Sequence, residues 1–159
     1  MKKIILGLLI VLSLLVLSGC SSDKNSPYTN ELKNTQIASN TEFSGDVFEI
    51  SLDEVSNQLK KYDYTSSKGI NVKFFAIKGS NGGVRTAFDA CDVCGGYKGY
   101  RQEGGDIVCN NCGRHFDING LGTQNKGYGC WPSYLSHKIE SGKVIINTAE
   151  LEAGAYRFA

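Results

Sequence analysis

The chain has 159 residues, of which 41% are hydrophobic and 21% are charged. This length suffices for one compact domain and is too short for two domains of ordinary size. The formal net charge of +1 provides no summed basic field to hold a nucleic-acid backbone, so no nucleic-acid partner is expected. The six cysteines need an explanation, because they are grouped too unevenly for a disulfide scaffold.

The first 20 residues have the order of an export signal. Two lysines precede an uncharged, mostly apolar run over residues 4–17, which is shorter than the roughly 20 residues that a membrane-spanning helix needs. Residues 17–20, LSGC, resemble a bacterial lipobox, in which the cysteine becomes the lipid-modified first residue. We therefore expect a signal peptide over residues 1–19 and an extracytoplasmic protein anchored to a membrane through Cys20. The alternative is a plain secretory signal that leaves Cys20 as a spare thiol.

Residues 20–44 are predicted to form a flexible tether behind the lipid. Their composition is mainly Ser, Asn, Thr, Asp, Glu and Lys, which cannot bury enough apolar surface to offset the entropy of ordering. A flexible chain of this length spans roughly 25 to 30 Å. The folded domain is expected over residues 45–159, close to the membrane surface without being embedded in it.

The folded part has the alternating pattern of short strands. In chain order, strands are predicted at residues 48–52, around 62–64, at 70–78, 84–89, 99–102, 106–109, 115–118, 138–140 and 143–147. Glycine-rich turns separate residues 70–78 from 84–89 and residues 138–140 from 143–147, which indicates two hairpins.

Helical signals are few. Ser51 and Glu54 have the spacing of a capping box for at most two turns, and Thr148 could cap one turn near the end of the chain. Tyr156 and Phe158 are expected to close the core. The fold class is therefore mainly β, a small antiparallel domain with at most one or two short helices and no βαβ pattern.

Two C-x-x-C motifs carry the strongest functional signal. Cys91 and Cys94 form the first, Cys109 and Cys112 form the second, and a glycine follows each pair. Two residues between thiolates let one tight turn present both sulfurs to a single ion. Two such knuckles predict a closed four-sulfur metal site, with two disulfides or a redox motif as the competing interpretation outside the cytoplasm.

The spacing does not choose the metal. Fourteen residues separate the two motifs, just under the roughly 15 to 20 of zinc ribbons, so zinc is allowed. One iron, a two-iron cluster or a four-iron cluster also accepts four thiolates. The site has no open position for a substrate, so an electron carrier or metal-binding accessory protein is expected more than an enzyme.

Two resemblances extend this interpretation. Residues 109–120, CNNCGRHFDING, resemble the second ligand loop of Rieske-type domains, although Cys94 and Cys112 stand where those domains have histidine. All-thiolate ligation would lower the potential below the Rieske range. A Rieske-like or rubredoxin-like arrangement is accordingly expected.

The second resemblance covers residues 46–158. The run from residue 84 to residue 116, followed by GCWP at 129–132, is similar to an uncharacterised family named for membrane iron-sulfur proteins of the FtrD-like type. That resemblance implies an iron-sulfur cluster, 2Fe-2S or 4Fe-4S, and a membrane partner in iron transport or electron transfer. Trp131 departs from the family, in which asparagine usually precedes the proline.

Cys130 is left over once the two motifs have supplied four ligands. It is a candidate additional ligand or a redox-active thiol, and the simpler interpretation is a buried cysteine. The leading hypothesis is a lipid-anchored iron-sulfur protein that transfers single electrons. A structural zinc module that docks a membrane partner and a thiol-disulfide protein that uses Cys130 are the alternatives.

Overall fold

The computed structural model describes residues 45–94, 97–127 and 129–159. The predicted signal peptide, the lipidation site Cys20 and the tether lie outside these residues and stay predictions. The strands are β1 (Val47–Ser51), β2 (Lys60–Thr65), β3 (Asn71–Lys78), β4 (Val84–Cys91), β5 (Tyr100–Glu103), β6 (Asp106–Cys109), β7 (His115–Asp117), β8 (Pro132–Tyr134), β9 (Lys138–Glu140) and β10 (Lys143–Asn147). The helices are α1 (Thr148–Gly154) and the 3-10 helices η2 (Leu52–Glu54), η3 (Ile118–Gly120) and η4 (Ala155–Phe158).

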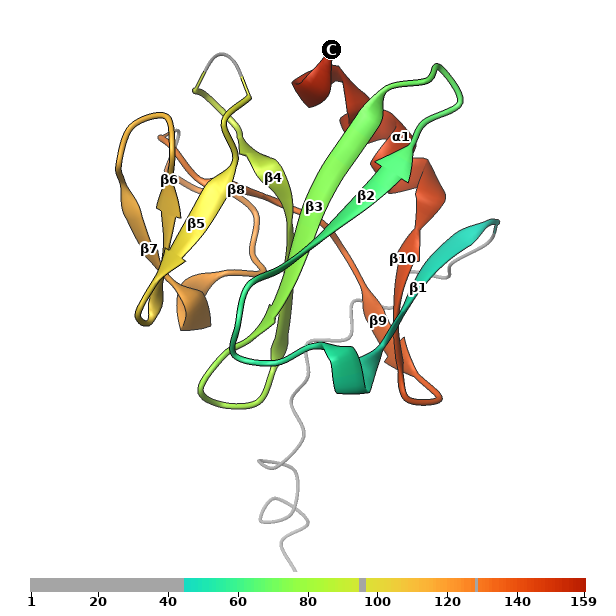
Figure 1. Cartoon of the computed structure of the whole chain (residues 1–159), viewed down its shortest axis with the longest axis horizontal. Helices are drawn as coiled ribbons and strands as arrows, with labels where there is room; N and C mark the ends of the chain where they lie inside the picture. Colours follow the sequence, from blue (N-terminus) through green and yellow to red (C-terminus); the bar gives the residue numbers. More distant parts are fainter. Residues whose placement is uncertain (1–44, 95–96, 128) are drawn as a thin grey trace, which may run out of the picture. The chain divides into compact units, whose positions relative to one another are not determined.

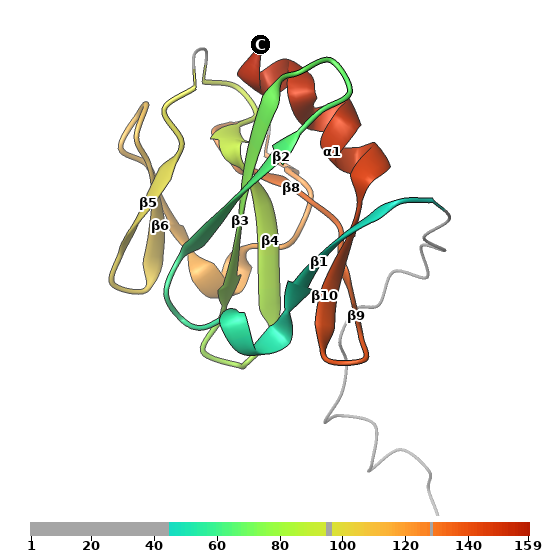
Figure 2. The same cartoon turned by 45° about the vertical axis from the view of Figure 1, so that its right-hand side comes forward.

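The strands form three antiparallel sheets with the orders β1-β10-β9, β2-β3-β4-β8 and β5-β6-β7. Figure 1 shows strands β3 and β4 in the middle, with β5, β6 and β7 on one side and β1, β9 and β10 on the other, and the turned view in Figure 2 agrees. The prediction of a mainly β, antiparallel domain is confirmed.

The position of strand β3 explains why five of the eight residues in its sequence, NVKFFAIK, are apolar. Alternate side chains of a strand project to opposite faces, and both faces of this strand are covered. Phe74 and Ala76 pack into one hydrophobic cluster, whereas Phe75 and Ile77 pack into the other. The middle sheet is therefore the wall that both cores share.

The two cores differ in what they contain. The first core joins the middle sheet to β1, β10 and α1, and is entirely free of cysteine among the described residues; its members include Ile50, Phe74, Phe88, Val144, Ile146 and Leu151. The second joins the middle sheet to β5, β6 and β7, and contains buried Cys109, with Cys91, Cys94 and Cys130 packed against it. The cysteines thus belong to the second core.

The helix predictions need three corrections. The turn after Ser51 is the 3-10 helix η2 of three residues, and Ser51 makes no side-chain cap. Asn147, not Thr148, caps α1 by accepting a hydrogen bond from the amide of Ala149, while the Thr148 hydroxyl donates to the carbonyl of Asp46. Tyr156 is 69% exposed and does not close the core, whereas Phe158 packs against the first hydrophobic core.

No helix among the described residues is long and apolar enough to cross a membrane.

Candidate metal centre

Four elements bring five cysteines to one end of the second core. Cys91 ends β4, Cys94 lies in the loop that follows, and Cys109 ends β6. Cys112 lies in the turn between β6 and β7, and Cys130 comes two residues before β8. The pairing of β4 with β8 places Cys91 opposite Pro132, and the amide of Asp92 donates to the carbonyl of Trp131. This pairing carries Cys130 to the first knuckle.

The sulfur atoms lie within a few ångströms of one another. Those of Cys91, Cys94, Cys109 and Cys130 all lie within 4.8 Å of each other. The Cys130 Sγ lies 3.1 Å from that of Cys91, 3.7 Å from that of Cys94 and 3.3 Å from that of Cys112. Cys130 is therefore at the centre of the group and is not a remote spare thiol.

The two sequence motifs are brought together, as their spacing predicts. The compact group of four nevertheless contains Cys130 and lacks Cys112, which is exposed. The predicted ligand set of Cys91, Cys94, Cys109 and Cys112 stays a prediction, and Cys130 now competes with Cys112 for the fourth position.

The donor set fits a thiophilic metal. A metal-sulfur bond of about 2.3 Å places the sulfurs of a tetrahedral site about 3.8 Å apart. The 3.7 Å between the sulfurs of Cys130 and Cys94 matches that value, and the 3.1 Å between those of Cys130 and Cys91 is shorter, so the four sulfurs would hold one ion after a small adjustment. A cluster with inorganic sulfide also takes cysteine thiolates as ligands, and it would require the four sulfurs to lie farther apart than one ion does.

Hydrogen bonds within the group set unequal acidities. Burial acts to raise the pKa of Cys91, but hydrogen bonds with the amide of Val93 and with Cys130 lower it to about 7. The hydrogen bond with Cys91 raises the pKa of Cys94 to about 12, and burial raises that of Cys130. A hydrogen bond from the backbone of Arg114 lowers the pKa of Cys112. Because a metal ligand is the thiolate, binding of an ion would release the protons that these thiols hold.

The second knuckle is a tight turn that its backbone closes. The amide of Gly113 donates to the carbonyl of Cys109 over 2.8 Å, and the amide of Cys109 donates to the carbonyl of Arg114 over 3.0 Å. Gly113 has a φ of +75°, which an L side chain rarely adopts. The glycine after the second motif is therefore required by the turn itself.

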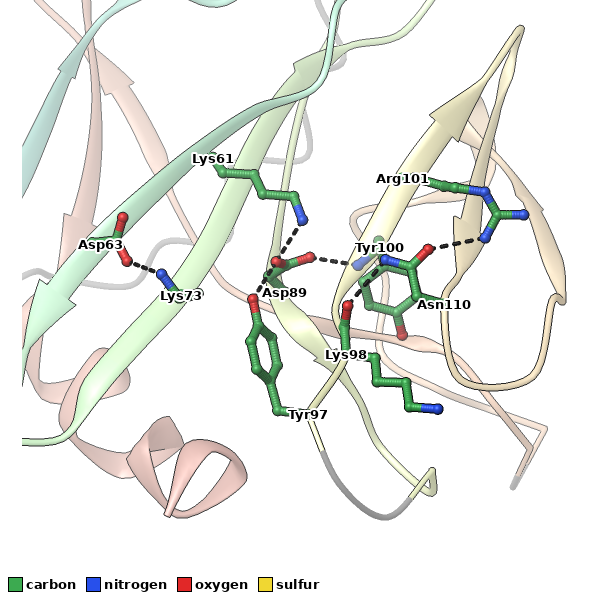
Figure 3. Close-up of polar contacts among 9 residues, drawn as sticks. All are labelled: Lys61, Asp63, Lys73, Asp89, Tyr97, Lys98, Tyr100, Arg101 and Asn110. Carbon is green, nitrogen blue, oxygen red and sulfur yellow. Dashed lines mark hydrogen bonds and ion pairs between the residues drawn. The ribbon is translucent and has the colours of Figure 1, made fainter.

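Asn110 ties this knuckle to the segment before β5. Its amide nitrogen donates to the carbonyl of Lys98, and its side-chain oxygen accepts a hydrogen bond from Arg101 over 2.9 Å (Figure 3). Its backbone amide donates to the carbonyl of Gly99. The second knuckle is thus held against residues 98–101.

A buried carboxylate anchors the first knuckle. Asp89, two residues before Cys91, is fully buried and accepts hydrogen bonds from Lys61 over 2.7 Å, Tyr97 over 2.8 Å and the amide of Tyr100 over 2.7 Å (Figure 3). A buried charge persists only when it is paired and hydrogen-bonded in this way. Asp89 therefore fixes both ends of the loop that carries Cys94.

Gly99 is needed beside this carboxylate. A Cβ on Gly99 would lie 2.5 Å from Oδ2 of Asp89, and its φ is +69°. We expect Gly99→Ala to lower the free energy of unfolding by about 3 kcal/mol, since overpacking adds to backbone strain. Gly104→Ala is the matched control, because Gly104 has a φ of +58° with nothing within 4 Å of the added Cβ.

Urea denaturation of both variants, followed by circular dichroism, checks this expectation. Gly104→Ala should lose only about 1 kcal/mol, the cost of positive φ. Equal losses in the two variants would show that the Asp89 carboxylate moves aside freely.

The centre lies near the surface. Cys112 is exposed, and Val93, between the two cysteines of the first motif, is 57% exposed. A cavity of about 280 Å³ opens beside Cys130 and is also lined by Arg114, Lys126 and Trp131. A second, polar cavity of about 580 Å³, lined by Asp92, Glu150 and Arg157 among others, lies outside the cysteine group.

Asp89 and Asn110 were not predicted as part of the site, whereas Tyr100 could be identified from its place near the knuckles as an aromatic that shields the centre or packs the core. The sequence held one signal for Asp89, because it is the only acidic residue in the sequence of β4, VRTAFDAC. Asn110 lies between two cysteines, where polar residues are ordinary, so nothing in the sequence marks it.

Together these features define a small β protein whose cysteine sulfurs form a cluster that can bind a metal ion. The sequence matches the model of a family described as "Membrane iron-sulfur containing protein FtrD-like" over residues 55–158. The match covers more than half of the chain, so the protein belongs to the FtrD-like family. No curated protein and no solved structure matches it.

Proposed function

We propose that the protein is an extracytoplasmic, lipid-anchored iron-sulfur protein that carries single electrons. The observation that carries the proposal is the group of four cysteine sulfurs within 4.8 Å of one another, beside an exposed knuckle. Membership of a family described as iron-sulfur containing favours iron over zinc. The short path from these sulfurs to the surface suits exchange of electrons with another protein.

The ligands proposed are Cys91, Cys94, Cys109 and Cys130. Three of them belong to the sequence motifs, and Cys130 replaces Cys112 because its sulfur completes the compact group. Cys112 lies 3.3 Å from Cys130 and is a fifth thiol at the solvent side.

An iron-sulfur centre supplies one-electron oxidation and reduction when it is bound. The chain would hold it through thiolates of the two knuckles and of Cys130, and Asp89 and Asn110 keep the knuckles in place. Four protein ligands leave no open coordination position, so bond-making chemistry on a substrate is not proposed.

The proposed partner is a membrane protein of an iron-transport or respiratory system. The family name supports a membrane setting, and the lipobox-like sequence at residues 17–20 supports anchoring through Cys20. A tether of residues 20–44 would let the domain reach its partner at the membrane surface.

A redox titration of the full chain, purified without oxygen and followed by visible absorption, tests electron transfer. The expected result is a reversible change that fits one electron per protein. A change that needs two electrons and releases free thiols would indicate disulfide chemistry instead, which the 3.1 Å separation of Cys91 and Cys130 would permit.

Radiolabelled palmitate tests the anchor separately. Cells that produce the full chain should yield labelled protein, and a Cys20→Ser variant should be unlabelled. Label retained by that variant would contradict lipidation at Cys20.

A further inference from the structure

One buried hydroxyl beside the cysteines has no hydrogen-bond partner. Tyr100 is 1% exposed, and its hydroxyl contacts no donor or acceptor with hydrogen-bond geometry in the described part of the chain. A buried hydroxyl without a partner is costly, and native proteins rarely leave one in place without a reason.

The register of the sheet directs this side chain toward the metal centre. Tyr100 on β5 is paired with Cys109 on β6. Residues paired across two antiparallel strands project from the same face of the sheet. Tyr100 and Cys109 also belong to one hydrophobic cluster, against which Cys91, Cys94 and Cys130 pack. Burial raises the pKa of Tyr100, and so do the nearby charge of Cys91 and an approach of the hydroxyl to the Cys91 sulfur that does not reach hydrogen-bond geometry.

The ring has little freedom to turn away. Its edges pack against Phe75 and Phe116, with ring centroids 6.0 and 6.2 Å apart in T-shaped arrangements. The backbone amide of Tyr100 is fixed by its hydrogen bond to Asp89, as Figure 3 shows. The hydroxyl therefore cannot reach solvent by a simple rotation of the side chain.

We infer that the Tyr100 hydroxyl donates a hydrogen bond to a sulfur atom of the bound metal centre and thereby raises its reduction potential. The acceptor is a cysteine thiolate or an inorganic sulfide, both of which carry negative charge. Reduction adds one electron to the centre, so a donor at its sulfur stabilises the reduced state more than the oxidised state. This inference rests on the proposed iron-sulfur function.

Tyr100→Phe removes only the hydroxyl, and the chain offers a matched control. Tyr62 also has a buried hydroxyl without a partner, but it packs against the first core, which holds no described cysteine. Redox titration of the iron-loaded full chain should give a lower midpoint potential for Tyr100→Phe, with iron content unchanged. Tyr62→Phe should leave the potential at the wild-type value.

A second measurement keeps a tyrosine side chain with its hydroxyl at residue 100, so that the test does not depend on folding of Tyr100→Phe. Site-specific 3-fluorotyrosine at residue 100 makes the phenol a stronger donor and should raise the midpoint potential. Equal potentials in all iron-loaded proteins would overturn the role of Tyr100 and leave the proposed function intact. Wild-type protein that binds no iron would overturn both.

Discussion

A Cys109→Ser protein is expected to lose the metal centre. Cys109 is the most buried of the five cysteines at 1% exposure, and it ends the strand whose turn forms the second knuckle. A serine hydroxyl stays protonated at neutral pH and cannot replace a thiolate as a soft ligand. Losing a hydrogen bond that supports a ligand costs up to about 100-fold in metal affinity. Losing the ligand itself should cost more, so we expect metal affinity to fall by more than about 100-fold.

Metal content of anaerobically purified protein, measured with the visible spectrum, checks this prediction. Cys20→Ser is the control, because residue 20 precedes the residues that the family model matches and this substitution should leave the centre unchanged. A Cys109→Ser protein with the full metal content and spectrum would remove Cys109 from the ligand set.

The second large effect separates Cys130 from Cys112. Cys130→Ser should lose the centre or bind it far more weakly, because its sulfur lies within 4.8 Å of three other candidate ligands. Cys112→Ser should keep the centre, since Cys112 is exposed and lies outside the compact group. The pair is well matched, because each variant changes one sulfur to one oxygen at the same site.

Metal content and electron paramagnetic resonance of the two variants give the answer. Loss of the centre in Cys112→Ser together with retention in Cys130→Ser would restore the ligand set that the two C-x-x-C motifs predict. Equal loss in both variants would mean that the centre uses all five thiolates.

The strands could be predicted from the sequence because most of them alternate or end at strong turns. The hairpin of β9 and β10 is an example: Ser141 and Gly142 both have positive φ, as a two-residue turn between such strands requires. Strand β3 was predictable by its length and its β-branched and aromatic residues, although both of its faces are buried.

Strand β8 could not be predicted by the same means. It has three residues, begins with Pro132 and has no alternation to detect. Its existence depends on pairing with β4, a long-range contact that local pattern does not encode. That pairing also decides where Cys130 lies, so the sequence alone left Cys130 unassigned.

The residues that hold the cysteine loops in place could not be predicted from the sequence for a similar reason. The C-x-x-C spacing reveals the sulfurs because two ligands must share one turn. Asp89 and Lys61 meet only because β2 and β4 flank β3 in the folded sheet. Local sequence therefore identified the thiols, whereas the tertiary fold determines what holds them.

Quantifying iron, zinc and acid-labile sulfide decides whether these cysteines bind an iron-sulfur centre. The measurement uses the full chain purified without oxygen, with visible absorption and electron paramagnetic resonance before and after reduction. The expected result is coloured protein that contains iron and whose resonance signal changes on reduction. Colourless protein with one zinc ion, or metal-free protein with two disulfides, would contradict it.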